Sequence, residues 1–157
     1  MFTHVDETNQ PTMVDVSSKD ITLRRALAES SVILTDEIMS HFKGNDISTK
    51  KGPVFQTAIV AGTMAAKKTA DLIPLCHTLM LQSCKIDIKP KGDNRILIQC
   101  EVVTSGKTGV EMEALCGASI SALTIYDMCK AFSHEIVVET TRLIEKQGGK
   151  NDFQRKK

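Results

Sequence analysis

Residues 106–132 read GKTGVEMEALCGASISALTIYDMCKAF, and the rest of the chain is arranged around them. From position 110 onward this stretch is apolar on every side of a helical wheel, and its charged residues are Glu111, Glu113, Asp127 and Lys130. A helix that is apolar all round either spans a membrane or is buried on more than one face. Because the uncharged run at 114–126 is well short of the ~20 residues that a bilayer crossing needs, we predict a buried helix of a soluble protein.

The middle of this helix is thin, which allows another backbone to come close. Its small residues are Gly117, Ala118, Ser119, Ser121 and Ala122. At the start of the helix, Thr108 and Glu111 have the spacing of a capping box, with Gly109 in the turn between them. We therefore predict a capped helix that packs tightly against a second element.

The charged residues of the helix lie at its two ends. Asp127 and Lys130 are spaced i, i+3 and are neighbours on one face. Glu113 points almost the same way as Asp127, but the rise of ~1.5 Å per residue separates them by roughly 21 Å along the axis. One copy cannot easily bring both ends to one small molecule. Two copies packed antiparallel about a two-fold axis can, so we predict a site that straddles a subunit interface.

The composition favours a single domain over residues 1–157 with its own core. Twenty basic and nineteen acidic residues give a net charge of +1, and with no Trp and one Tyr the chain is not expected to bind nucleic acid or a membrane. The opening residues are polar and predict no secretory signal. Five cysteines without a CxxC pair are typical of reduced thiols in a cytoplasmic protein, and no metal site or disulfide scaffold is expected.

The remaining elements follow from periodicity and turn residues. We expect a mobile arm at 1–12, a strand at 22–34, a short helix at 36–43 that Thr35 caps and Gly44 ends, and a polar loop at 45–51. A helix then starts at Gly52-Pro53 and runs to about residue 73, where Pro74 ends it. Strands at 84–89 and 96–102 form a hairpin around PKGDN, a last strand covers 135–145, and residues 146–157 form a flexible tail.

The order β, α, β, β, α, β predicts the α+β class and a ferredoxin-like domain. Such a domain has a four-stranded antiparallel sheet with both helices on one face. That layer would leave one side of an all-apolar helix in water, which is unfavourable at ~25 cal/mol per Å². We therefore predict self-association through this side.

Four groups of residues are candidates for chemistry, and each has a structural interpretation beside the functional one. The structural alternative for Lys51 is a solvent-exposed loop lysine. For His77, which follows Leu75 and Cys76, it is a histidine at the start of a strand with its hydrogen bonds satisfied. Glu111, beside Met112 and Glu113, is also read as a capping-box partner. Asp127 and Lys130 are also read as a surface ion pair, but the apolar residues around them predict burial. A partly buried lysine has a lowered pKa and becomes an acid or base near neutral pH.

Two short motifs do not carry the chemistry that they suggest. Gly106-Lys107-Thr108 resembles the end of a phosphate-binding loop, but the first glycine of that motif is replaced by Glu101. Cys76-His77 lacks further residues at metal-ligand spacing. A nucleophilic thiol at Cys76 stays open as an alternative.

Several segments together resemble one family of enzymes. They are MVDVSSK (13–19), KGPV (51–54), AGTMAAKKT (61–69), DLIPLCH (71–77), GKTGVEMEAL (106–115), LTIYDMCKA (123–131) and GGK (148–150). The pattern is similar to the cyclic pyranopterin monophosphate synthase family, the accessory protein C of molybdenum cofactor biosynthesis. The resemblance covers residues 13–150.

The resemblance implies a homohexamer, built as a trimer of dimers with active sites at the dimer interface. The implied reaction converts 3′,8-cyclo-7,8-dihydroguanosine 5′-triphosphate, made from GTP by a radical GTP cyclase, into cyclic pyranopterin monophosphate and diphosphate. It implies that Asp127 is the acid/base residue and that Lys130 and Lys51 assist proton transfer. The implied substrate-binding residues are Leu75, Cys76, His77, Glu111, Met112, Glu113, Arg24 and Lys150, the last two near phosphate. No redox cofactor is implied, and the sequence leaves open whether Mg²⁺ accompanies the triphosphate.

The chemistry of these residues agrees with the resemblance. A triphosphate needs cations, and a carboxylate such as Glu113 accepts the N–H donors of a guanine-derived ring. A lysine and an aspartate in a dry pocket transfer protons, while fixed positive charge helps diphosphate to leave.

This sequence also departs from the family pattern. Pro53 stands where the family most often has an acidic residue, and Thr78 stands where proline is usual, which puts the placement of His77 in doubt. Cys116 replaces a usual threonine, and Asn151 follows GGK.

Two other functions remain as alternatives. One is a non-catalytic nucleotide-binding oligomer that serves as a sensor, which would bind substrate without converting it. The other is a different pterin-forming hydrolase, which would release formate or yield no diphosphate.

Overall fold

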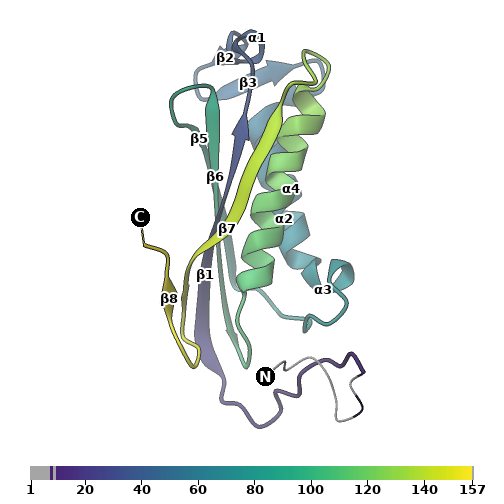
Figure 1. The fold of residues 1–157 in the computed structure, drawn as a ribbon, viewed down its shortest axis with the longest axis vertical. Helices are drawn as coiled ribbons and strands as arrows, with labels where there is room; N and C mark the ends of the chain where they lie inside the picture. Colours follow the sequence, from purple (N-terminus) through teal and green to yellow (C-terminus); the bar gives the residue numbers. More distant parts are fainter. Residues whose placement is uncertain (1–7, 9, 157) are drawn as a thin grey trace.

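Two long helices cover one face of an antiparallel sheet, and a small second sheet lies at one end of the molecule (Figure 1). This computed structural model describes residue 8 and residues 10–156. Most of the predicted N-terminal arm, residues 1–7 and 9, lies outside the described residues. The α+β class with antiparallel sheets is confirmed.

The main sheet contains five strands in the order β5-β6-β1-β7-β8. They are β1 (Thr22–Ile33), β5 (Ser83–Pro90), β6 (Arg95–Gly106), β7 (Val137–Gln147) and β8 (Phe153–Gln154). The predicted sheet of four strands is therefore wrong by one strand, because residues of the predicted tail pair with β7 at Glu145↔Gln154 and Lys146↔Phe153. Four of the strands are those that the alternating pattern predicted, since one face of each is apolar and packs against the helices.

The helices are α1 (Asp36–Met39), α2 (Val54–Lys67), α3 (Thr69–Leu72) and α4 (Glu111–Cys129). Helix α4 contacts β1, β6 and β7, and α2 packs between α4 and β5. No helix within the described residues has both the length and the hydropathy that a bilayer crossing requires. The predicted central helix is confirmed as α4, which carries buried alanines at helical spacing: Ala114, Ala118 and Ala122.

The two long helices cross at glycines, as the small residues of α4 predicted. A Cβ atom on Gly62 would lie 2.1 Å from Ser121 Oγ and 2.6 Å from the Gly117 carbonyl oxygen. At the same crossing, Ser121 donates a hydrogen bond of 3.0 Å to the carbonyl oxygen of Ala58. The close approach of α2 and α4 therefore depends on residues without bulk.

The capping box predicted from Thr108 and Glu111 is wrong. Val110 is the N-cap of α4, and no side chain caps this end of the helix. The carboxylate of Glu111 turns instead toward Lys146 on β7, whose Nζ lies 3.2 Å from Glu111 Oε1. A charge that is distant in sequence has replaced the local capping partner.

The segment before α2 also differs from its prediction. The helix at 36–43 ends at Met39, and the chain then forms three short strands: β2 (Phe42–Lys43), β3 (Asp46–Thr49) and β4 (Gly52–Pro53). Together they form the small sheet, so the region predicted as a polar loop is mostly a hairpin. Gly44, with φ of +64°, turns the chain between β2 and β3.

Two element ends are shifted from their predicted positions. Helix α2 ends at Lys67 and the chain restarts as α3, where the predicted helix continued to residue 73. The hydroxyl of Thr69 bonds the carbonyl oxygens of Ala65 and Ala66 at this break, so a side chain replaces backbone hydrogen bonds. Pro53 is the N-cap of α2 and not part of its first turn.

We expect Gly62→Ala to destabilise the protein. The added methyl group clashes with Ser121 and the Gly117 carbonyl, which costs about 1–3 kcal/mol against a gain of about 1 kcal/mol in helix propensity. Chemical denaturation of both proteins measures the difference. Gly106→Ala is the control, because its nearest neighbour would be 3.6 Å from the new Cβ. Equal stability of Gly62→Ala and wild type would contradict the crossing described here.

Candidate active site

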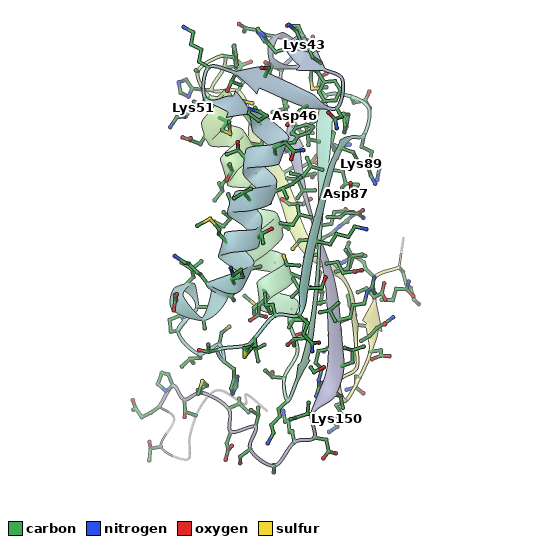
Figure 2. All side chains as sticks on the ribbon, turned by 180° about the vertical axis from the view of Figure 1, so that it is seen from behind. Lys43, Asp46, Lys51, Asp87, Lys89 and Lys150 are labelled. Carbon is green, nitrogen blue, oxygen red and sulfur yellow. The ribbon has the colours of Figure 1, made fainter. Side chains whose placement is uncertain are left out.

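The predicted site residues gather at the two ends of α4. Lys51 lies beside the C-terminal end of the helix, whereas Lys150 lies at the opposite end of the molecule (Figure 2). Asp127 and Lys130 belong to the first group, and the other predicted residues belong to the second. One subunit therefore carries two separate halves of the predicted site.

At the C-terminal end of α4, one carboxylate is held by two ammonium groups. Lys51 Nζ lies 2.9 Å from Asp127 Oδ2 and 3.1 Å from the carbonyl oxygen of Asp127. Lys130 Nζ lies 2.8 Å from the other carboxylate oxygen, Oδ1. The three predicted catalytic residues are thus in direct contact, and we call them the lysine–aspartate cluster.

The lysine–aspartate cluster faces solvent in the single subunit. The side chains of Lys51, Lys130 and Asp127 are 51%, 47% and 55% exposed, so the predicted burial is wrong for one copy. Hydrogen bonds from Lys130 and Lys51 lower the pKa of Asp127 to about 2. The same carboxylate raises the pKa of Lys130, which is opposite to the predicted shift, because in water the ion pair outweighs desolvation.

An apolar pocket of about 210 Å³ adjoins this cluster. It is lined by Thr49, Lys50, Lys51, Met128, Ala131 and Phe132. The Phe132 ring stacks on His41, with 4.4 Å between the ring centroids. The Lys51 side chain thus lies between this apolar pocket and the carboxylate of Asp127.

At the N-terminal end of α4 lies a cationic pocket of about 610 Å³. Its six basic side chains are Lys19, Arg24, Arg25, Lys107, Lys146 and Lys150. Two acidic side chains, Asp20 and Glu111, also line it. Basic side chains outnumber acidic ones six to two, so the pocket has the charge that binding a polyanion requires.

The predicted phosphate-binding residues Arg24 and Lys150 both line the cationic pocket. Arg24 Nε donates to the carbonyl oxygen of Gly106 at 3.3 Å, which holds its guanidinium against the loop before α4. The Gly148-Gly149 turn brings Lys150 to the same place, because Thr22 Oγ1 donates to the Gly148 carbonyl at 2.7 Å. Gly148 has φ of +85°, and a Cβ there would lie 1.8 Å from the Leu23 carbonyl oxygen, so this turn requires glycine.

Sequence reasoning missed four of the six basic residues, namely Lys19, Arg25, Lys107 and Lys146. Lys19 and Lys107 lie inside segments that carried the family resemblance, which was a usable signal. Arg25 is already paired with Glu101 and Glu145 across the sheet. Lys146 reaches the pocket from β7, and nothing in its local sequence indicates that position.

A second pocket of about 340 Å³ shares Lys19 and Glu111 with the cationic pocket. It is lined by the six predicted substrate-binding residues other than Arg24 and Lys150: Leu75, Cys76, His77, Glu111, Met112 and Glu113. The structure therefore brings these residues together from the segment after α3 and the first turn of α4.

The polar groups of this second pocket are partly engaged. His77 Nε2 lies 2.7 Å from the carbonyl oxygen of Val14, so this nitrogen is the donor of a hydrogen bond that fixes the ring. This contact with the segment before β1 holds His77 at the pocket that it lines. Burial raises the pKa of Glu113, which is only 4% exposed. Burial also raises the pKa of Cys76, which disfavours the thiolate that a nucleophile requires.

Within the described part of the chain, no group of three or more His, Cys, Asp or Glu side chains is placed to hold a metal ion. All five cysteines are free thiols.

Comparison with known proteins places this geometry in a family. The chain is 58% identical over 156 residues to the molybdenum cofactor biosynthesis bifunctional protein of Synechocystis sp., covering 97% of this chain and 45% of that protein. It is 49% identical to a cyclic pyranopterin monophosphate synthase of Xanthomonas oryzae (97% of this chain, 92% of that protein) and 47% identical to one of Bacillus mycoides (96% and 94%). The family model described as the MoaC family matches residues 13–149. The chain therefore belongs to the MoaC family.

Proposed function

We propose that this chain is a cyclic pyranopterin monophosphate synthase of molybdenum cofactor biosynthesis. Its substrate is 3′,8-cyclo-7,8-dihydroguanosine 5′-triphosphate, and its products are cyclic pyranopterin monophosphate and diphosphate. The observation that carries the proposal is the contact of Lys51 and Lys130 with the two oxygens of one carboxylate, Asp127. A carboxylate in contact with two amino groups can serve the several proton transfers that opening and closing a ring system requires.

The two pockets at the other end of α4 divide the substrate between them. The basic side chains of the cationic pocket bind the triphosphate, and Arg24 and Lys150 stabilise the negative charge that develops as diphosphate leaves. The adjoining pocket holds the guanine-derived ring, whose N–H donors the Glu113 carboxylate accepts. The Asp127 carboxylate and the ammonium groups of Lys51 and Lys130 donate and accept the protons of the rearrangement.

The complete site forms between two subunits, because one subunit holds its halves at opposite ends of α4. An antiparallel pair places the substrate pockets of one copy next to the lysine–aspartate cluster of the other. Exposed apolar side chains on the outer faces of α2 and α4 support this pairing; they include Val60, Met64 and Leu123. Three such dimers form the hexamer.

Assembly also explains how Lys130, whose pKa is raised in the single subunit, becomes useful as a base. A second subunit and a bound substrate would exclude water from the lysine–aspartate cluster, and desolvation lowers the pKa of an ammonium group. The apolar pocket beside Lys51 contributes to the same effect. In this proposal, the ion-paired lysine–aspartate cluster of the single subunit is the form that exists before substrate binds.

The core of each subunit is ferredoxin-like in this proposal. The four long strands have the order β5-β6-β1-β7, both long helices pack on the same face, and β8 is an addition at the edge.

The enzyme needs no resident cofactor, and any Mg²⁺ arrives with the triphosphate. The radical GTP cyclase supplies the substrate, and the bifunctional name of one relative supports a shared pathway. Five free thiols support a location in the reducing cytoplasm.

Lys130→Ala tests the proposed chemistry. We expect product formation to fall by about 100-fold or more, because a proton donor and acceptor is lost, while the assembly stays intact. The measurement is the yield of cyclic phosphate and of diphosphate from the cyclised GTP substrate. Lys89→Ala is the matched control, since Lys89 forms a similar exposed ion pair with Asp87 on the edge strand β5. Product at the wild-type rate from Lys130→Ala would overturn the assignment, and binding without turnover in wild type would indicate a sensor.

A mixing experiment tests the shared site. Lys130→Ala and Glu113→Gln are each expected to be nearly inactive, because every site in either oligomer lacks one group. When the two variants are unfolded together and refolded, mixed dimers contain one intact site, so about a quarter of the wild-type activity should return. Activity no higher than the sum of the separate variants would contradict a site built from two subunits.

The acid limb of the rate profile tests the role of Glu113. Burial raises the pKa of this carboxyl group, so it takes up a proton at a higher pH than an ordinary glutamate and then no longer accepts the substrate N–H. We expect kcat/KM to fall as the pH drops through that raised value. Asp127, with a pKa of about 2, stays ionised there and does not contribute. Profiles between about pH 4 and 8 should lose this limb in Glu113→Gln, and an unchanged limb would contradict the role.

A further inference from the structure

The N-terminus of α2 is capped by a residue from another element. Pro53 occupies the N-cap position and offers no side-chain hydrogen bond. The backbone N–H groups of Phe55 and Gln56 donate instead to Asp46 on β3, over 2.7 Å to Oδ1 and 3.1 Å to Oδ2. These are the N2 and N3 groups that a capping side chain normally satisfies, and the negative charge suits this end of the helix dipole.

The same carboxylate fixes the start of the hairpin that carries Lys51. Asp46 Oδ1 also accepts the N–H of Ile47, over 2.6 Å. Ile47 and Phe55, the residues whose N–H groups share this oxygen, are both buried in the core. Asp46 is therefore a tether between the first residue of β3 and the first turn of α2.

The tip of this hairpin is also held. Strands β3 and β4 pair at Ser48↔Pro53 and Thr49↔Gly52, which leaves Lys50 and Lys51 in the turn. Thr49 Oγ1 accepts the N–H of Lys51 at 3.1 Å and donates to the Gly52 carbonyl at 3.1 Å. Asp46 at the base and Thr49 at the tip thus define where Lys51 can lie. Figure 2 shows Asp46 and Lys51 at the same end of the molecule.

Lys51 needs this support because its contact with Asp127 joins two exposed side chains. Such pairs contribute little to holding a loop in place. Asp127 belongs to α4, and α4 is fixed to α2 at the Gly62–Gly117 crossing. A continuous set of contacts therefore runs from the hairpin through Asp46 to α2, and from α2 to the helix that carries Asp127.

We infer that Asp46 is a positioning residue for Lys51, which it holds against Asp127 by tying the Lys51 hairpin to the first turn of α2. The functional importance of this tether rests on the catalytic role proposed for Lys51. The existence of the tether is independent of that role, so it is tested by a measurement that does not depend on activity.

The reactivity of Lys51 toward an amine-acylating reagent reports its position. In the intact full-length protein, hydrogen bonds to Asp127 hold the Lys51 amine against that residue, which restricts its access to the reagent and slows its acylation. In Asp46→Ala, we expect the acylation rate of Lys51, followed by peptide mass spectrometry, to rise roughly two- to fivefold. Lys130 should change little, because it contacts Asp127 from the same helix end, and Lys89 on β5 is a second internal reference.

Two further variants separate positioning from helix capping. Asp46→Ala/Pro53→Asp supplies a capping carboxylate at the N-cap itself, so it should restore thermal stability while Lys51 stays as reactive as in Asp46→Ala. Asp46→Asn keeps one acceptor oxygen and should give an intermediate rate. Thr35→Ala, which removes the cap of α1, is the control for general destabilisation and should leave the Lys51 rate unchanged.

Kinetics of the same variants connect the tether to the reaction. We expect Asp46→Ala to lower kcat by about tenfold or more with a smaller change in KM, because Lys51 is misplaced while the distant phosphate pocket is intact. An unchanged Lys51 rate in Asp46→Ala, or a rate that returns to normal with Pro53→Asp, would overturn the tether. A raised Lys51 rate with unchanged kcat would uphold the tether and contradict the catalytic role of Lys51.

Discussion

The close crossing of α2 and α4 is the constraint on which the rest of the structure depends. Neither Gly62 nor Gly117 accepts a side chain without a shift: a Cβ on Gly62 would meet Ser121 and the Gly117 carbonyl oxygen, and one on Gly117 would meet the Cys100 sulfur of β6. At this crossing, α4 is packed between α2 and the main sheet. The charged groups at its ends are consequently fixed at a distance that no side-chain motion can bridge.

Because of that separation, the two groups of predicted site residues lie at opposite ends of one subunit. One end of α4 presents a carboxylate between two ammonium groups, and the other presents basic side chains around a pocket large enough for a polyanion. The net charge of +1 conceals this arrangement, because acidic side chains in other parts of the chain balance the basic ones, for example Glu139 opposite Arg95. The proposed two-fold pairing of the helices would bring the two ends together without any change in the subunit fold.

The sequence predicted the elements that have a regular period and missed those that do not. The long strands and α4 follow from alternation and from an apolar helical wheel, whereas β2 and β4 are two residues each and show no period. Long-range electrostatic contacts account for two further features that the sequence did not predict. Lys146 draws Glu111 away from the predicted capping box, and Asp46 caps α2 from a strand, so neither contact is visible in a local window.

The predicted site residues lie in two groups in the fold, but the exposure of their side chains was not predictable from the sequence. Lys130 has apolar neighbours in sequence, which suggested burial, yet Met128 and Cys129 face the core while the Lys130 ammonium group reaches solvent. The resemblance supplied Arg24 and Lys150, and only the folded chain adds Lys107 and Lys146 to the same pocket.

The central claim is that opposite ends of α4 from two subunits meet at one substrate. A crystal structure of the assembled protein with the cyclised GTP substrate, or a non-reacting analogue of it, tests this claim most directly. The account predicts one molecule in contact with Glu113 of one subunit and Lys130 of the partner subunit, in a pocket closed to bulk water. An assembly in which these two side chains of neighbouring subunits face solvent, far from each other, would contradict it.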